Sequence, residues 1–147
     1  MNPTIKVYRS DKNATIPAFK KSGDAGMDAT SVEEKIINPM SFSVVNTGLR
    51  FEIPVGYEIQ VRPRSGLAAN YGISVLNTPG TIDSGYRGDV KAILFNFSDK
   101  PFKVEIGMRI CQLVVSKLDE FNLEEVTTFS TDSDRSEGGF GSTGLKN

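Results

Sequence analysis

The segment Arg62–Ala69, with the sequence RPRSGLAA, contains residue types that could bind an anion. Arg62 and Arg64 directly precede Ser65, which is a common helix-capping residue, and Gly66 follows. Free backbone N–H groups at a helix start, a hydroxyl and a guanidinium together suit phosphate oxygens. A capped helix with solvated arginines would use the same residues, so this segment alone leaves both interpretations open.

A second candidate is Asn77–Asp89, NTPGTIDSGYRGD, which is rich in turn-forming residues around an isolated Ile82 and Asp83. A glycine-bounded β-hairpin here could bring backbone N–H and C=O groups against a flat ligand, because Gly80 permits close approach. We expect Asp83 at the base of this hairpin and Tyr86 on its return strand. The alternative is an ordinary surface hairpin with Asp83 in a turn.

Carboxylate and amide groups occur in two further segments. Asp24 and Asp28 would share one face of a strand and could share a cation, although two solvated loop carboxylates are the commoner outcome. Gln112 interrupts the apolar run Ile110–Val115, and an unpaired buried amide costs about 1–3 kcal/mol. A ligand contact and a structural hydrogen bond therefore both stay open for Gln112. We expect Arg109 to pair with a carboxylate.

The C-terminal stretch Arg135–Asn147, RSEGGFGSTGLKN, fits no regular element. It is rich in glycine and small hydroxyl residues, yet it carries Arg135 and a single aromatic residue, Phe140. Such a segment cannot build a core of its own, so packing within the chain does not explain the aromatic ring.

The composition narrows the possible chemistry. The 147 residues suffice for one domain, and 17 basic against 18 acidic residues give no strong field for nucleic acid or an anionic membrane. The chain has no histidine, which excludes a histidine base and histidine-bound metals, and its one cysteine, Cys111, cannot form an intrachain disulfide. Proton chemistry therefore falls to carboxylates, Tyr or Lys, and any metal is expected to be a hard cation held by oxygen.

No apolar stretch of signal-peptide length occurs in the N-terminal MNPTIKVYRS, and no run reaches the roughly 20 apolar residues of a membrane span. We therefore expect a soluble, cytoplasmic protein with no nucleic-acid or membrane partner.

Apolar residues recur mostly at every second position. They alternate with polar or charged residues in Leu49–Ile53, Tyr57–Val61 and Phe102–Ile106, which predicts half-buried strands. Ala92–Phe95 and Ile110–Val115 are apolar on both faces, which predicts central strands. Turn residues separate these runs, and many short strands at this spacing favour an antiparallel all-β fold such as a jelly roll.

The remaining elements are few. One short helix is predicted over Ser65–Tyr71, with Ser65 as its N-cap, and Leu123–Phe129 is predicted as the last strand. From Ser130 onward the composition shifts to Ser, Thr, Asp and Gly, which indicates a mobile arm. We therefore expect a β-barrel domain over residues 1–129 and a flexible arm over residues 130–147.

Taken together and in order, five segments resemble the motifs of the homotrimeric dUTPase family, whose members hydrolyse dUTP to dUMP and pyrophosphate. The five segments are DAGMDATS, RPRSGLAA, GTIDSGYRGDV, GMRICQLVV and RSEGGFGSTG. The resemblance spans residues 24–144. It implies an all-β, jelly-roll-type β-barrel of the dUTPase-like β-clip kind, with one short helix and a mobile C-terminal arm. It also implies a homotrimer with three active sites at the subunit junctions.

The resemblance further implies a role for each matching residue. Asp83 corresponds to the carboxylate that orients and deprotonates the water directed at the α-phosphorus. Tyr86 corresponds to the ring that packs against the deoxyribose and leaves no room for a 2′-hydroxyl. Asp28 corresponds to the aspartate that reaches Mg²⁺ through water, the ion itself being chelated by the triphosphate.

The other implied substrate-binding residues form three groups. The group that reads uracil is Asn77, Gly80, Thr81 and Ile82. The group that binds phosphates is Arg64, Ser65, Gly66 and Gln112. The group in the arm, which closes over a neighbouring subunit's site, is Arg135 at the γ-phosphate, Phe140 over the uracil ring, and Gly141.

The implied function limits uracil incorporation into DNA and supplies dUMP for thymidylate synthesis. Two alternative functions use similar residue types. A dCTP deaminase-like enzyme would need a glutamate at the base, and Ile73–Tyr86 contains none. A non-catalytic nucleotide-binding trimer would be favoured by loss of Asp83, Tyr86 or the arm, and all three are present.

Overall fold

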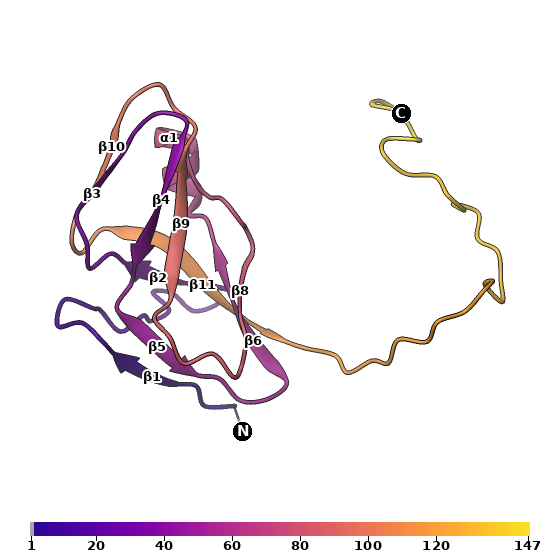
Figure 1. The fold of residues 1–147 in the computed structure, drawn as a ribbon, viewed down its shortest axis with the longest axis horizontal. Helices are drawn as coiled ribbons and strands as arrows, with labels where there is room; N and C mark the ends of the chain where they lie inside the picture. Colours follow the sequence, from indigo (N-terminus) through magenta and orange to yellow (C-terminus); the bar gives the residue numbers. More distant parts are fainter. Residues whose placement is uncertain (1) are drawn as a thin grey trace.

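The computed structural model describes residues 2–147, and within them the chain forms eleven strands and one helix (Figure 1). The strands are β1 Lys6–Arg9, β2 Met27–Thr30, β3 Lys35–Ile37, β4 Ser41–Asn46, β5 Leu49–Glu52, β6 Tyr57–Arg62, β7 Ile73–Val75, β8 Gly80–Ile82, β9 Lys91–Asn96, β10 Phe102–Val104 and β11 Arg109–Lys117. The helix is α1 Ser65–Tyr71.

The strands pair antiparallel in four small sheets. The largest has the order β2-β11-β6-β8, the next is β4-β9-β7, and two-stranded sheets are formed by β1 with β5 and by β10 with β3. Inward-facing side chains from these sheets meet in one hydrophobic core. The jelly-roll-type all-β fold predicted from the sequence is confirmed.

Alternation of apolar and charged residues sets which face of each strand is buried. In β5, Leu49 and Phe51 are buried while Arg50 and Glu52 are exposed. The prediction that Ala92–Phe95 and Ile110–Val115 form central strands is confirmed, because β9 lies between β4 and β7 and β11 lies between β2 and β6. The two faces of β9 nevertheless differ in burial. Ala92 and Leu94 are fully buried, but Ile93 and Phe95 on the other face are only half-buried. An apolar face therefore stays partly uncovered on β9.

Helix α1 has the predicted bounds but not the predicted cap. Arg64 is the N-cap residue, no side chain caps the helix start, and Ser65 is already the first helical residue. The helix ends at Gly72, which has the left-handed φ of 67° and donates its N–H to the Ala68 carbonyl at 3.1 Å. No helix within residues 2–147 is long and apolar enough to cross a membrane.

The predicted hairpin at Asn77–Asp89 is wrong in its pairing. Strand β8 pairs with β6, whereas the preceding β7 pairs with β9, so the turn between β7 and β8 joins two different sheets. Tyr86 lies in the loop after β8 and not on a return strand. The turn residues marked the chain reversals, but pairing partners depend on contacts far apart in the sequence.

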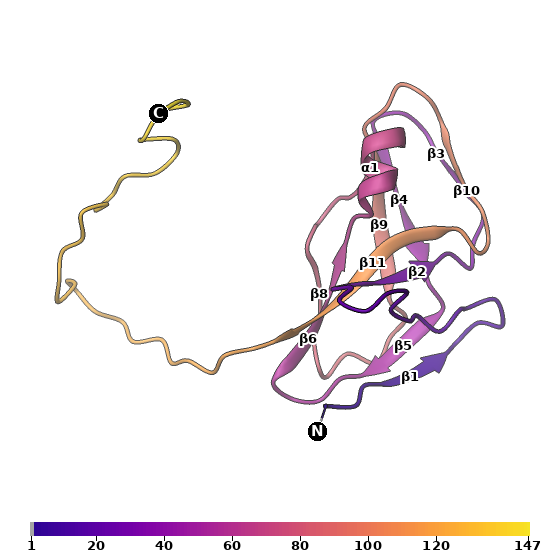
Figure 2. The same cartoon turned by 180° about the vertical axis from the view of Figure 1, so that it is seen from behind.

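The predicted strand over Leu123–Phe129 is also wrong. Regular structure ends with β11 at Lys117, and the chain then leaves the body of the molecule in both views (Figures 1 and 2). Leu123 and Phe129 are 92% and 87% exposed. Alternation of apolar residues indicates that a segment could form a strand, but it does not indicate whether the same chain provides a strand to pair with it. The division of the chain at residues 129 and 130 stays a prediction.

One buried side chain ties the smaller sheets together. Asn96 at the end of β9 is fully buried, and its Nδ2 donates to the carbonyls of Ile37 at 2.9 Å and Lys100 at 2.7 Å. Its Oδ1 accepts the backbone N–H of Ser98 at 2.9 Å. The amide thus joins β9 to β3 and to the turn that leads into β10.

We expect Asn96→Ala to destabilise the fold, because it leaves the buried backbone groups without partners, at a cost of about 1–3 kcal/mol for each. Urea unfolding measures this change. The control is Asn70→Ala, an exposed position on α1 where alanine favours the helix. A loss below about 0.5 kcal/mol for Asn96→Ala, within the usual effect of surface substitutions, would contradict this account.

Candidate functional site

Three cations surround the Asp28 carboxylate on β2, and we call this group the cation cluster. The Arg64 Nε lies 3.1 Å from Oδ1, Arg109 Nη1 lies 3.3 Å from Oδ2, and Lys20 Nζ lies 3.7 Å from Oδ2. One carboxylate cannot balance three cations, so the cluster keeps an excess of positive charge and suits an anion. The expectation that Arg109 pairs with a carboxylate is confirmed.

Asp24 does not share a cation with Asp28. It lies before β2 begins, in an exposed turn where its Oδ2 accepts the Lys21 N–H at 2.9 Å. The described residues hold no group of three or more His, Cys, Asp or Glu side chains able to bind a metal ion. The carboxylate pair predicted as a possible cation site is therefore split, because the strand starts too late to include Asp24.

Gln112 lies on β11 beside the cation cluster. Its backbone pairs with Asp28 on one side and Arg62 on the other, and its Nε2 donates to the Pro63 carbonyl at 2.9 Å. Its Oε1 occupies the space of a side chain at Gly26, since a Cβ built there would lie 2.5 Å away. Gly26 thus makes room for the amide, and Gln112 has at least the structural hydrogen bond that the sequence left open.

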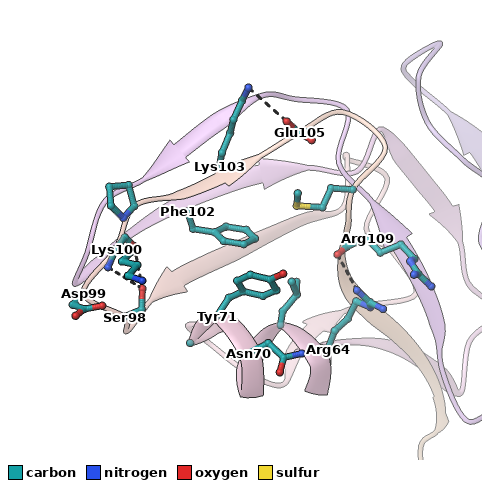
Figure 3. Close-up of a pocket in the computed structure, with 14 residues that line it drawn as sticks. Arg64, Asn70, Tyr71, Ser98, Asp99, Lys100, Phe102, Lys103, Glu105 and Arg109 are labelled. Atoms are coloured by element: carbon teal, nitrogen blue, oxygen red, sulfur yellow. Dashed lines mark hydrogen bonds and ion pairs between the residues drawn. The ribbon is translucent and has the colours of Figure 1, made fainter.

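A cleft of about 940 Å³ runs beside the cluster, between α1 and β10 (Figure 3). Its floor is apolar, with the rings of Tyr71 and Phe102 facing each other at a centroid distance of 5.6 Å. Arg64 and Arg109 lie at one end, where Arg64 Nη1 donates to the Arg109 carbonyl at 3.3 Å. Ser65 and Gly66 at the start of α1 are exposed.

A separate hollow of about 300 Å³, the β8 hollow, contains the other predicted site residues. Its lining includes Thr81, Ile82, Asp83 and Tyr86. No residue of the cation cluster lines it. The predicted site is thus split into two parts within one chain.

Gly80 begins β8 against the neighbouring strand β6. A Cβ there would lie 3.2 Å from Val61 Cβ and 3.4 Å from Asn77 Nδ2. Glycine at this position lets the backbone of β8 and the Asn77 amide lie close together beside the hollow, which is the close approach that the sequence predicted.

The loop after β8 holds its functional side chains by local hydrogen bonds. The Tyr86 N–H donates to the Asp83 carbonyl at 3.1 Å, and the Tyr86 hydroxyl donates to the Asp89 carbonyl at 3.0 Å. Within residues 2–147, no hydrogen bond or ion pair holds the Asp83 carboxylate, which lies on an exposed residue. Asp83 is therefore available to bind water or substrate.

Asp89 fixes the far end of this loop. Its carboxylate accepts Arg50 Nε at 2.6 Å and Asn46 Nδ2 at 2.9 Å. The hydrogen bond from Arg50, followed by that from Asn46, lowers the pKa of Asp89 to about 2. No local sequence pattern marks this role, because Asp89 and Arg50 are far apart along the chain.

The only thiol of the chain belongs neither to the cation cluster nor to the lining of the β8 hollow. Cys111 is fully buried, and burial raises the pKa of its thiol to about 12. A thiolate nucleophile is therefore not available at neutral pH, and the carboxylates keep the role that the absence of histidine assigned to them.

The arm keeps its predicted site residues away from both halves in the same chain (Figures 1 and 2). Arg135 Nε donates to the Gly138 carbonyl at 2.9 Å, and turns such as Ser142 N–H to Gly139 carbonyl give the tail local shape. Phe140 is fully exposed with a φ of 49°, and Gly141 has a φ of 80°.

The site also includes residues that the sequence did not single out for it. Lys20 stands next to Lys21 with nothing around it to mark a binding residue, and Gly26 carries no chemistry of its own. Gly26 lies inside the DAGMDATS segment, so its position in that motif was the available signal. Lys20 joins the cluster only through folding, and no local pattern marked it.

The fold and the site define an all-β protein with a cluster of excess positive charge and a separate carboxylate in a hollow. A sequence model of the dUTPase family matches residues 12–144. The chain is 49% identical over 141 residues to the deoxyuridine 5′-triphosphate nucleotidohydrolase of Clostridium tetani, covering 96% of this chain and 97% of that protein. It is 51% identical to the protein of the same name from Clostridioides difficile, covering 96% and 98%. The chain belongs to the dUTPase family.

Solved structures agree with this assignment. A variant of the dUTPase of Staphylococcus bacteriophage 80alpha, solved with dUpNHpp, superposes with a TM-score of 0.90 at 27% identity and covers 98% of this chain and 100% of that one. A phage phi11 dUTPase variant described with a structural Mg(II) ion has a TM-score of 0.81 at 22% identity, covers 88% of this chain and 100% of that one, and adds support for the fold alone. The family resemblance drawn from the five motifs is confirmed.

We expect acid to weaken the Asp89 contacts. Because the folded pKa of Asp89 is lower than its ordinary value of 3.8, the carboxylate contributes stability above about pH 4 and loses it as the pH falls through about 2. Asp89→Asn should therefore be less stable than the original chain near neutral pH, and the difference should shrink toward about pH 3.

Urea unfolding at several pH values measures this convergence. Asp119→Asn, on an exposed residue of the chain after β11, controls for the loss of one negative charge. A constant difference between Asp89→Asn and the original chain from neutral pH into acid would show that the carboxylate contributes nothing through its charge.

Proposed function

We propose that this chain hydrolyses dUTP to dUMP and pyrophosphate, with Asp83 as the base that activates the attacking water. The observation that carries the proposal is the exposed Asp83 carboxylate, which has no partner among the described residues and lines the β8 hollow with Tyr86. The chain is a hydrolase of the dUTPase family, a dUTP diphosphatase. Its reaction limits uracil incorporation into DNA and supplies dUMP for thymidylate synthesis. A cytoplasmic location stays part of this proposal.

The β8 hollow is proposed to hold the nucleoside. The Tyr86 ring packs against the deoxyribose, so a ribose 2′-hydroxyl is rejected by a steric clash. Asn77, Gly80, Thr81 and Ile82 read the uracil edge, and the close approach of the Asn77 amide to Gly80 supports this role. A deaminase is not favoured, because Ile73–Tyr86 supplies no glutamate to protonate a pyrimidine.

The cation cluster is proposed to hold the phosphates. Arg64 carries the charge, and Ser65, Gly66 and Gln112 add polar contacts at the start of α1 and on β11. Support comes from the excess positive charge around Asp28 and from the exposure of Ser65 and Gly66.

Mg²⁺ is proposed as the cofactor, and the residues present fit one mode of binding. The described residues provide Asp28 but no cage of three or more ligating side chains, so the triphosphate must be the main ligand and Asp28 must act through water. When bound, the ion would neutralise charge on the triphosphate. Asp28 would then give up some of its ion pairs in order to contact the ion through water, and the cations released from it would contact phosphate oxygens.

The two halves of the site lie on opposite edges of the four-stranded sheet. In the order β2-β11-β6-β8, Asp28 belongs to one edge strand and Asp83 directly follows the other. Three strand spacings and an offset of about four residues separate them by roughly 20 Å. One chain therefore does not supply both halves to one substrate, and we propose that a second copy contributes the cation cluster.

The outer face of the β4-β9-β7 sheet supports assembly, and a homotrimer is the proposed state. Phe42 and Val44 on β4 are 59% and 41% exposed, and they lie opposite the half-buried Phe95 and Ile93 on β9. This apolar face continues to the β8 hollow, whose lining also includes Val44 and Ile93. Contact between copies at this face would bury it and place each hollow at a junction.

The arm is proposed to close over a site on a neighbouring copy. It leaves the body, and its polar contacts are internal, so Arg135 and Phe140 are free to act elsewhere. Arg135 holds the γ-phosphate, and Phe140 next to Gly141 stacks over uracil.

The proposed reaction follows from these positions. Asp83 accepts a proton from a water while the water oxygen bonds to the α-phosphorus, and the bond from that phosphorus to the bridging oxygen breaks. Arg64, Arg135 and backbone N–H groups stabilise the charge on the departing pyrophosphate. Positioning and electrostatics supply most of the acceleration, and the base adds about 10²–10⁴-fold.

We expect Asp83→Asn to lower kcat for dUTP by about 10²–10⁴-fold while binding of dUpNHpp is retained, because an amide cannot accept the proton. Pyrophosphate release and calorimetric binding measure the two effects. Asp99→Asn, at an exposed position beside α1, should leave kcat unchanged. Turnover near the original rate in Asp83→Asn would overturn the assignment of the base.

A mixing experiment tests the shared site. Subunits carrying Asp83→Asn and subunits carrying Arg64→Ala are each expected to be inactive alone. If each site takes Asp83 from one copy and Arg64 from another, random one-to-one mixed oligomers recover about a quarter of the original activity. No recovery, in mixtures whose subunits have exchanged, would place both residues in the same subunit's site.

A further inference from the structure

Gly88 lies next to Tyr86 in the loop after β8, and the tyrosine occupies the space of its missing side chain. A Cβ built on Gly88 would lie 2.5 Å from the Tyr86 hydroxyl oxygen, 2.7 Å from Cζ and 3.1 Å from Cε2. The φ of Gly88 is not in the left-handed region, so an alanine there would strain contacts and not the backbone. Glycine at this position therefore serves the tyrosine ring.

The two residues that follow Gly88 are held by hydrogen bonds, which restrains its backbone. Asp89, the next residue, is bound by Arg50 at 2.6 Å and by Asn46 at 2.9 Å. Val90 is buried, and its N–H donates to the Leu49 carbonyl at 2.8 Å. A side chain at position 88 would therefore displace the ring and not the loop.

Two hydrogen bonds position Tyr86. Its backbone N–H donates to the Asp83 carbonyl, and its hydroxyl, at the tip of the ring, donates to the Asp89 carbonyl. Tyr86 is 44% exposed and lines the β8 hollow. Pushed away from Gly88, the ring loses its bond to Asp89 and turns toward the hollow and solvent.

We propose that Gly88 is a positioning residue that sets how strongly the site rejects a ribonucleotide, by leaving the space in which the Tyr86 hydroxyl is held. This inference rests on the proposed role of Tyr86 against the sugar. A steric filter works only if the ring is held in place, because a mobile ring yields to a 2′-hydroxyl.

The test compares kcat/KM for dUTP and for UTP in Gly88→Ala. We expect the ratio of the two values to fall by about tenfold or more, because the ring loses its fixed position. Gly85→Ala is the matched control in the same loop, since a Cβ there meets nothing within 4 Å and its φ is also outside the left-handed region. This control should keep the original ratio.

The other outcomes overturn the inference. An unchanged ratio in Gly88→Ala does so, and so does an equal loss of activity on both nucleotides, which would indicate a merely structural role. Tyr86→Ala, measured in parallel, separates the role of Gly88 from the proposed contact between Tyr86 and the sugar. If Tyr86→Ala keeps the original ratio of kcat/KM for dUTP over UTP, the sugar contact of Tyr86 is wrong. If the ratio falls in Tyr86→Ala but not in Gly88→Ala, only the role of Gly88 is wrong.

A further variant covers the case in which Gly88→Ala does not fold. Tyr86→Phe keeps the glycine and the ring but removes the hydroxyl that occupies the space and bonds to Asp89. The ratio of kcat/KM for dUTP over UTP should fall in this variant, by less than in Tyr86→Ala. A ratio equal to the original would mean that the held hydroxyl does not set discrimination.

Discussion

The order of strands in the four-stranded sheet is the constraint on which the rest depends. Because β11 and β6 lie between β2 and β8, the positive charge gathered around Asp28 and the free carboxylate of Asp83 face different edges. Within one chain, this separation keeps Arg64 and Arg109 from forming ion pairs with Asp83. Among residues 2–147 the Asp83 carboxylate has no hydrogen-bond or ion-pair partner, which suits the base proposed for it.

Glycine residues help to position polar side chains in both parts of the site. At Gly26 and at Gly88 the absent side chain is replaced by a polar group from a neighbouring residue, Gln112 in one case and Tyr86 in the other. Each of these groups is then held by a backbone carbonyl, of Pro63 and of Asp89 respectively. The Gln112 and Tyr86 side chains, which could adopt several rotamers, are thereby held in one, and no charged group has to be buried to hold them.

Much of this could be predicted from the sequence, and the failures share one physical origin. Period-two alternation identified β5, β6 and β10, continuous apolar runs identified β9 and β11, and the bounds of α1 followed from local residue types. The pairing of β8, the missing strand at Leu123–Phe129 and the recruitment of Lys20 were missed, because each depends on a contact distant in sequence or on a surface outside the chain. For the site, ordered motifs carried the prediction, whereas the bonds that orient Tyr86 through Asp89 and Arg50 needed the fold.

The shape of the arm has a consequence for binding. Its last residues already contain turns, with Arg135 bonded to the Gly138 carbonyl, so the tip is a preorganised unit on a tether without strands or helices that starts after Lys117. Closing such a unit over a site orders mainly the tether, which lowers the entropy lost. For the arm closure proposed above, the tether length would set the effective concentration of the tip at a neighbouring site, and a longer segment between Leu118 and Ser130 would lower it without altering any contact.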